Sequence, residues 1–220
     1  MVAPDEGEGA EAPSSRLVRC ICCGVTLVEI DVSRAAAHLL IAWQLLMLAL
    51  FALWCEYDYA LGAPMDLTYT WYVNLALFAL VGLGLHLAFA SRYALTAVGF
   101  TLLLTALSLQ WGVLANGYFA ALAARARVLG GARLGVSLAT LLDAEVGALA
   151  TLVSFGALVG RVSLLQATVL AIVETVVYSA NQALVLADGA LAVCDVGGTV
   201  GVHLFGAYFG LAVSLALTGT

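Results

Sequence analysis

The sequence is poor in charge. Charged residues make up 10% of its 220 residues, lysine is absent, and the net charge is −6. A soluble domain is typically about a quarter charged, so this chain has too few charges to cover a surface exposed to water. It also has no basic patch, so nucleic acid is not an expected partner. A hydrophobic share of 64% and a mean hydropathy of +1.07 instead favour the lipid bilayer as its surroundings.

Catalytic and metal-binding patterns are also missing from the sequence. It contains no phosphate-binding loop, and no nucleophile is accompanied by an arranged base. A membrane-embedded enzyme would need clustered His, Asp or Glu, and this chain is poor in these residues. We therefore expect no enzyme activity, no catalytic residue, no metal and no cofactor.

Three of the five cysteines, Cys20, Cys22 and Cys23, form a cluster just before the first hydrophobic run. Zinc usually takes four ligands, so three thiols without a nearby histidine make a poor zinc site. S-acylation beside the membrane and free thiols in a cytosolic tail both remain open.

The chain divides into a polar tail and a membrane domain. Residues 1–34 are expected to form a cytosolic N-terminal tail that is partly disordered, because the first 19 residues are acidic and show no apolar periodicity. Residues 35–220 are expected to form one membrane domain. The acidic start lacks the basic n-region of a cleavable signal peptide, so the first apolar run is expected to act as signal and anchor.

Six long apolar runs predict six transmembrane helices, because about 20 helical residues cross the hydrocarbon core. The runs are continuous, whereas barrel strands would show short segments of alternating polarity. The predicted spans are 35–55, 71–90, 94–121, 143–159, 164–187 and 199–217. The sequence therefore predicts an all-α polytopic membrane protein.

The arginines near these spans favour a cytosolic N-terminus, because cytosolic loops carry an excess of positive charge. With this orientation the outer side holds three arginines, Arg125, Arg127 and Arg133. The cytosolic side holds five, namely Arg16, Arg19, Arg34, Arg92 and Arg161. Six crossings return the C-terminus to the cytosol, and we expect a multi-pass protein of the plasma membrane or another cellular membrane.

Polar residues within or beside the spans indicate positions with a specific purpose, because they are costly in lipid. His203 lies about five residues into the sixth span, where pore lining and a packing hydrogen bond are both open. Asp195 precedes that span, where it can cap the helix or recruit a cation. Glu174, Tyr178 and Asn181 share one helical face of the fifth span, which we expect to face protein.

Two pairs of glycines, Gly156 with Gly160 and Gly206 with Gly210, have the Gly-xxx-Gly spacing. This spacing is typical of helices whose backbones approach closely. The spacing does not identify the partner helix.

The sixth span also carries the longest motif. Residues 195–211 read Asp-Val-Gly-Gly-Thr-Val-Gly-Val-His-Leu-Phe-Gly-Ala-Tyr-Phe-Gly-Leu. This segment resembles the Rh branch of the Amt/MEP/Rh ammonium transporter family, which carries an Asp, a Gly-Gly, a His eight residues after the Asp, and Phe-Gly-Ala-Tyr-Phe-Gly. The resemblance extends over about residues 40–215 of the sequence. Matching segments earlier in the chain include Gln110-Trp111, Phe155-Gly156-Ala157 and Arg161-Val162-Ser163.

The resemblance implies half of an inverted-repeat fold. In that family two five-helix halves enclose a path at mid-membrane, and Rh proteins add one helix in front. This chain would be the extra helix plus the first half, a truncated Rh-like domain. The family's ammonia path has two hydrogen-bonded histidines, one per half, and His203 matches the first. An ammonium ion is expected to lose its proton at the outer mouth and to cross as ammonia.

The function implied by the resemblance is channel-type ammonium/ammonia transport, which would be defective where the second half is absent. The open alternative is a non-conducting Rh-derived membrane protein that associates with or modulates intact Rh-type subunits. Because the family is trimeric, a homo-oligomer or a hetero-oligomer with Rh-type subunits is expected. Phe205 and Tyr208 are expected to pack the last helix. The substrate pathway is expected to involve His203, Asp195, Phe205, Asn181 and Glu174.

The sequence departs from the family at three points. Val146 stands where the family has an aromatic gate residue on the fourth helix, and Gln182 follows Asn181 where Rh proteins have Asn-Glu. No Asn-x-Ser/Thr sequon occurs. These departures bear on whether the chain conducts independently.

Overall fold

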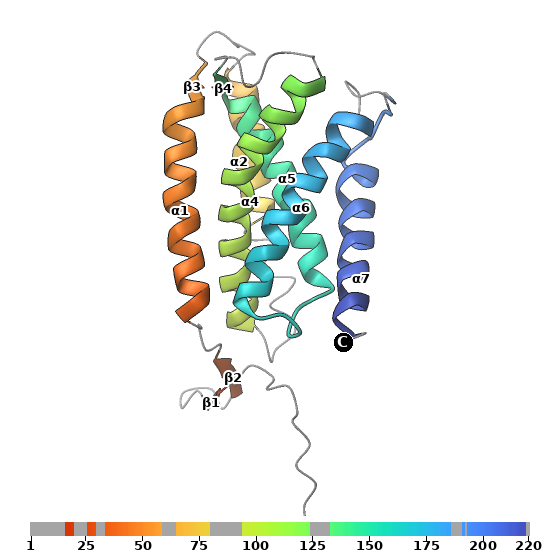
Figure 1. Ribbon diagram of the computed structural model, residues 1–220. Coiled ribbons are helices and arrows are strands. Elements are labelled where there is room, and N and C mark those ends of the chain that lie inside the picture. The colour runs from red at the N-terminus through yellow and green to blue at the C-terminus, as the bar shows by residue number, and fades with distance from the viewer. Residues whose placement is uncertain are drawn as a thin grey trace, which may run out of the picture.

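The computed structural model is a bundle of long helices with a short strand pair at each end (Figure 1). Consecutive helices run in opposite directions, as expected for a chain that crosses a membrane repeatedly (Figure 1). The structure describes residues 16–19, 26–29, 34–58, 65–79, 94–123, 133–185, 191 and 193–218.

Six α-helices form the bundle in this described part, and a π-helical turn, η2 (Thr199–Leu204), leads directly into the last of them. The helices are α1 (Arg34–Trp54), α2 (Met65–Leu77), α4 (Ala94–Ala123), α5 (Leu138–Gly156), α6 (Leu164–Val185) and α7 (Phe205–Thr218). Five segments are long and apolar enough to cross a membrane, and they comprise α1, most of α4, α5, α6, and η2 with α7. The predicted all-α polytopic membrane fold is confirmed.

Two predicted helix starts were late. The fourth span was predicted to begin at residue 143, but α5 begins at Leu138 because Ser137 caps it. The Ser137 hydroxyl accepts from the N–H of Thr140, and the Thr140 hydroxyl accepts from the N–H of Ser137. The second helix, α2, begins at Met65 rather than at residue 71. Residues 80–90 of that predicted span lie outside the described residues.

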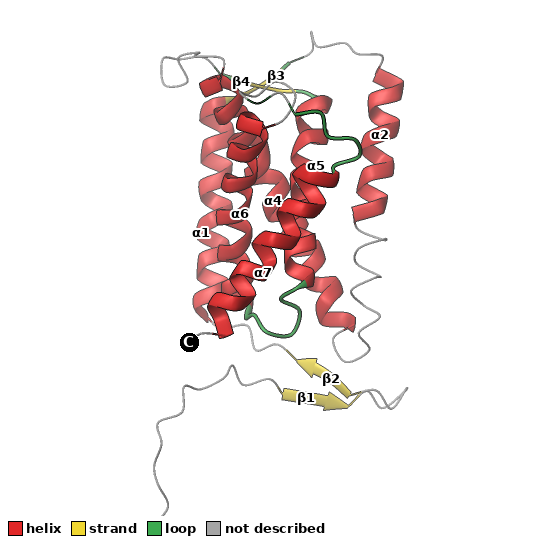
Figure 2. Cartoon of the chain, turned by 90° about the vertical axis from the view of Figure 1, so that its right-hand side faces the viewer, coloured by secondary structure: helices red, strands yellow, loops and turns green. Residues whose placement is uncertain are grey.

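The two strand pairs were not predicted. Strands β1 (Arg16–Arg19) and β2 (Thr26–Glu29) form an antiparallel hairpin beyond one end of the bundle (Figure 2). The hairpin includes the last four of the 19 residues expected to be disordered. At the other end, β3 (Cys55–Tyr57) pairs in parallel with β4 (Leu134–Val136), so the end of α1 is tied to the segment that enters α5.

The core of the bundle lies where α4 packs against α5 and α6. Several hydroxyl side chains are buried there, and their own helices satisfy many of them. Thr101, Thr105 and Thr175 each donate to the carbonyl oxygen four residues earlier, at 2.7–2.8 Å. Because a polar group without a partner is costly inside a membrane, this local bonding lets threonine occupy an apolar interior. Phe100 of α4 stacks on Phe155 of α5, with ring centroids 5.3 Å apart.

Several positions that entered the sequence predictions are outside the described residues, so those predictions stay predictions. They are Cys20, Cys22, Cys23, Arg92, Arg125 and Arg127.

Candidate functional site

Asp195 caps the turn that carries His203. The Asp195 carboxylate accepts hydrogen bonds from the backbone N–H groups of Val200, at 3.1 Å, and Gly201, at 2.6 Å. These bonds favour the ionised carboxylate, and the Gly201 N–H, the strongest of them, holds the pKa of Asp195 below its ordinary value. The arrangement supports the capping interpretation of Asp195, because its oxygens are engaged by the turn that follows it.

The turn itself is wider than an α-helical one. The N–H of His203 donates to the carbonyl oxygen of Gly198, five residues earlier, at 3.0 Å. Gly197 and Gly198 have φ angles of 72° and 71°, a left-handed conformation that glycine adopts without a steric cost. Single π-helical turns are rare in proteins as a whole, and those that occur are often found at functional sites. The Asp–Val–Gly–Gly motif therefore fixes the backbone conformation at the start of η2, and with it the direction in which the His203 side chain leaves the helix.

His203 lies on the exposed side of that entry turn, within a segment long and apolar enough to span a membrane. The helix that follows, α7, packs on α5 through Gly206 and Gly210. A Cβ atom added at Gly206 would lie 2.6 Å from the carbonyl oxygen of Ala150, and one added at Gly210 would lie 2.6 Å from that of Ser154. The partner of this Gly-xxx-Gly pair is therefore α5.

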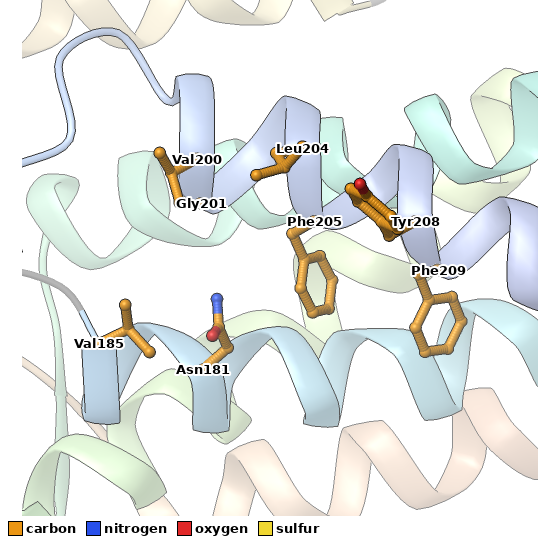
Figure 3. Close-up of a pocket in the computed structure, with 8 residues that line it drawn as sticks. All are labelled: Asn181, Val185, Val200, Gly201, Leu204, Phe205, Tyr208 and Phe209. Atoms are coloured by element: carbon orange, nitrogen blue, oxygen red, sulfur yellow. The ribbon is translucent and has the colours of Figure 1, made fainter.

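A groove of about 430 Å³ lies between α6 and the η2–α7 segment (Figure 3). Asn181 of α6 points across it toward η2, and Phe205 and Phe209 extend from α7 toward α6 (Figure 3). The Phe205 ring meets Tyr178 edge to face, with centroids 5.7 Å apart. The lining residues are Asn181, Val185, Val200, Gly201, Leu204, Phe205, Tyr208 and Phe209.

The predicted pathway residues fall into three places. Asp195 and His203 belong to one capped turn, and Asn181 and Phe205 line the groove beside it. Glu174 lies apart from both, because it is fully buried between helices. The structure thus brings Asp195 and His203 together in one turn, places Asn181 and Phe205 in the groove, and separates Glu174 from both.

Tyr208 differs from its prediction. Its side chain is 69% exposed, whereas Phe205 is half-buried against Tyr178, so of these two residues Phe205 is the one that packs against the described helices. Tyr178, which was expected to face protein, is 2% exposed. At the position of the family's aromatic gate, Val146 is half-buried and packs against the hydrophobic core.

The sequence analysis missed Ser154. Its hydroxyl contacts Glu174 of α6 and lies 2.8 Å from the carbonyl oxygen of Gly206 at the start of α7. A serine in the middle of an apolar helix carries no signal of such a position, since its partners depend on how three helices are rotated. Among the described residues, no group of three or more His, Cys, Asp or Glu side chains is placed to hold a metal ion.

Comparison with known proteins agrees with the motif in η2 and α7. The family model of the Ammonium Transporter Family matches residues 37–219. Ammonium transporter Rh type B of Sus scrofa is 36% identical over 137 residues, 62% of this chain and 28% of the relative. Ammonium transporter Rh type A of Bos taurus is 31% identical over 189 residues, 79% of this chain and 42% of the relative.

The matches cover most of this chain but less than half the length of these curated relatives. The family model nevertheless extends from α1 to the end of the described residues of α7, and so includes the capped turn and its histidine. The chain is therefore an Rh-type member of the Ammonium Transporter Family.

Proposed function

We propose that this chain forms one wall of an ammonium/ammonia pathway across a membrane. The observation that carries the proposal is the exposed position of His203 in a segment that is long and apolar enough to span a membrane. A polar group left unpaired in hydrocarbon costs on the order of several kcal/mol. A neutral imidazole can both donate and accept a hydrogen bond, which suits a path for a small polar molecule. The Rh-type relatives, which are named ammonium transporters, support this substrate.

The opposite wall must come from further protein. Lipid is a poor cover for His203, and Asn181 would also lose polar partners against lipid. We propose that an Rh-type half of inverted orientation covers this face, and that the chain is not monomeric in a membrane. These 220 residues alone should then show little or no saturable ammonia conduction.

Flux in vesicles tests the proposal. Methylammonium uptake is measured with this chain alone and with the chain co-reconstituted with the second half of an Rh-type relative. We expect saturable flux only in the second case, and we expect His203→Ala to abolish it. His38→Ala is the matched control, because His38 is an exposed histidine of α1 and should leave the flux unchanged.

Three outcomes would contradict this proposal. Robust flux through the chain alone, abolished by His203→Ala, would show that two copies build the pore. Absence of flux with a complement that binds would remove the transport function. Crosslinking that finds only monomers, with His203 reached by lipid-phase probes, would remove the covered interface.

The second candidate function is a non-conducting protein that associates with intact Rh-type subunits. Val146 favours it, because a half-buried valine within the hydrophobic packing replaces the family's aromatic gate. Under this alternative the chain co-purifies with an intact Rh-type transporter and changes its flux, and Val146→Phe restores no conduction. Conduction gained by Val146→Phe in the two-half vesicles would favour the pathway instead.

We also propose that both ends of the described bundle face the cytosol. The start of α1 and the end of α7 lie at the same end of the bundle (Figure 1), and the arginine balance favours the cytosolic side. Reporter tags at both ends should be inaccessible from outside intact cells. A surface-accessible C-terminal tag would contradict this orientation.

A further inference from the structure

Three helices meet at one hydroxyl group. The Ser154 Oγ of α5 contacts the Glu174 Oε1 of α6, and it lies 2.8 Å from the carbonyl oxygen of Gly206 in α7. Ser154 and Glu174 are both 0% exposed, and Gly206 is also buried. Neither contact belongs to the capped turn or to the groove described above.

Counting hydrogens decides how these contacts are made. A serine hydroxyl has one hydrogen to donate, whereas a peptide carbonyl and an ionised carboxylate can only accept. If Glu174 were ionised, two acceptors would compete for one hydrogen, and one close pair of oxygens would have none between them. If Glu174 carries a proton, it donates to Ser154 and Ser154 donates to Gly206, so both contacts become hydrogen bonds.

The surroundings of Glu174 agree with the protonated form. Its second oxygen, Oε2, is buried and has no hydrogen-bond partner among the described residues. An ionised carboxylate at mid-membrane is expensive unless a cation or several donors surround it. The only hydrogen-bond partner of the Glu174 carboxyl group in the described part of the chain is a hydroxyl, which suits a carboxylic acid.

The contact lies at one of the two close approaches of α7 to α5. Gly206 is where a Cβ would meet the carbonyl oxygen of Ala150 at 2.6 Å, so α7 is held against α5 at this level. Gly206 also follows His203 by three residues, less than one helical turn. A hydrogen bond that fixes Gly206 on α5 therefore also fixes the direction in which the imidazole is presented.

We infer that Glu174 is a neutral carboxylic acid that donates its proton to Ser154, and that the Glu174–Ser154–Gly206 chain positions α7, and with it His203, on α5. Glu174 is then a positioning residue rather than part of the path itself. This inference does not depend on conduction, because it concerns the folded bundle and can be tested without flux.

Infrared spectroscopy of the reconstituted full chain tests the proton at neutral pH. The wild-type spectrum minus that of Glu174→Gln should contain the carbonyl stretch of a protonated carboxylic acid. Glu56→Gln is the matched control, because Glu56 is exposed and its replacement should remove carboxylate bands. Loss of carboxylate bands in Glu174→Gln would overturn the inference.

Thermal unfolding tests the hydrogen-bond chain. Glu174→Gln keeps a donor toward Ser154 and should preserve the unfolding midpoint, whereas Glu174→Leu and Ser154→Ala should lower it by roughly 2–4 °C or more. If Glu174→Gln lowered the unfolding midpoint as much as Glu174→Leu, the proposed hydrogen-bond chain would be overturned. A donor toward Ser154 would then contribute nothing to stability.

Thiol reactivity on the exposed face of α7 tests positioning separately from stability. In a chain whose native cysteines are replaced by serine, Ala207→Cys places a thiol on the exposed side of α7. Its reaction rate should change severalfold with Ser154→Ala but not with Glu174→Gln. Ser108→Ala is the control, since the buried Ser108 hydroxyl bonds Thr151 of α5 and not α7. Equal rates in all variants would overturn the positioning part.

Discussion

The first and last membrane helices are both attached to the outside of the same core, but by different kinds of contact. Only 11% of the α1 span and 22% of the η2–α7 span are buried, against 56% for the spans of α4 and α5. Trp43 of α1 packs edge to face on Trp111 of α4, with ring centroids 5.3 Å apart, and the β3–β4 pair holds the end of α1. The last helix, α7, instead rests its glycine backbone directly on α5.

The two kinds of contact differ in how tightly they fix the position of a helix against the core. Large side chains can adjust when a neighbour changes, whereas two backbones in contact leave no flexible atoms to give way. The first helix presents Ile41, Leu45 and Leu48 outward, which suit lipid, with Gln44 as a polar exception. The last helix presents His203, whose direction matters for any pathway. Under the proposed pathway, the backbone contact therefore occurs in the helix whose rotation sets the direction of His203.

The largest effect should come from widening the contact of α5 and α7. Gly206→Ala and Gly210→Ala each place a Cβ 2.6 Å from a backbone oxygen of α5, so the helices must separate. Each substitution should lower the free energy of unfolding by about 1–3 kcal/mol, as overpacking does. Unfolding of the reconstituted chain by a denaturing detergent, followed by circular dichroism, measures the loss.

A matched glycine separates this effect from helix propensity. Gly99 lies in α4, and a Cβ added there meets nothing within 4 Å. Gly99→Ala should therefore be neutral or should stabilise by up to about 1 kcal/mol, because alanine is the better helix former. Equal losses at Gly99 and Gly206 would show that the backbone contact does not explain the effect.

A smaller effect should come from Trp111, the tryptophan of α4 that α1 contacts and that also bonds α6. The Nε1–H of Trp111 donates to the carbonyl oxygen of Ile172 in α6, at 3.1 Å, while its ring meets Trp43. Trp111→Phe keeps a ring but removes the donor, and should cost roughly 1–1.5 kcal/mol of unfolding free energy. Trp71→Phe is the control, because Trp71 is 62% exposed on α2. Equal stability of the two variants would contradict a stabilising contribution from the Trp111 hydrogen bond to α6.

Most of the fold was predictable because membrane-spanning helices can be recognised in a sequence as long apolar runs. The start of α5 was missed because Asp143 and Glu145 suggested a polar boundary, yet Glu145 is 2% exposed inside the helix. The β3–β4 pair was missed because it joins segments almost eighty residues apart. Pairing over such distances depends on how the helices between the strands pack, which hydropathy does not describe.

The candidate site was predictable where its residues are neighbours in the sequence. Asp195 and His203 share one motif, and the structure places them in one capped turn. The partner of Glu174 was not predictable, because Ser154 reaches it only through the rotation of α5 against α6. Helical spacing likewise grouped Glu174 with Asn181, but only Asn181 opens into the groove.

The smallest effect should come from the cap that starts the last helix. Asp195→Leu removes both carboxylate oxygens from the N–H groups of Val200 and Gly201, and should lower the unfolding free energy by about 1 kcal/mol. Asp195→Asn keeps one capping oxygen, so it should lower the unfolding free energy by only a few tenths of the amount expected for Asp195→Leu. Equal thermal stability of the two variants would argue against capping.

The charge of Asp195 adds a pH dependence that the asparagine variant lacks. The Gly201 N–H and the other backbone donors lower the pKa of the folded carboxyl below its ordinary value of 3.8. The contribution of the ionised Asp195 carboxylate to the free energy of unfolding is therefore complete above the ordinary pKa. It is lost as the pH falls through the lower pKa of the folded state. The stability difference between wild type and Asp195→Asn should stay constant from neutral pH to about pH 5 and shrink only in stronger acid. A difference that disappears near neutral pH would mean that another group titrates, and that the Gly201 contact does not hold the carboxylate ionised.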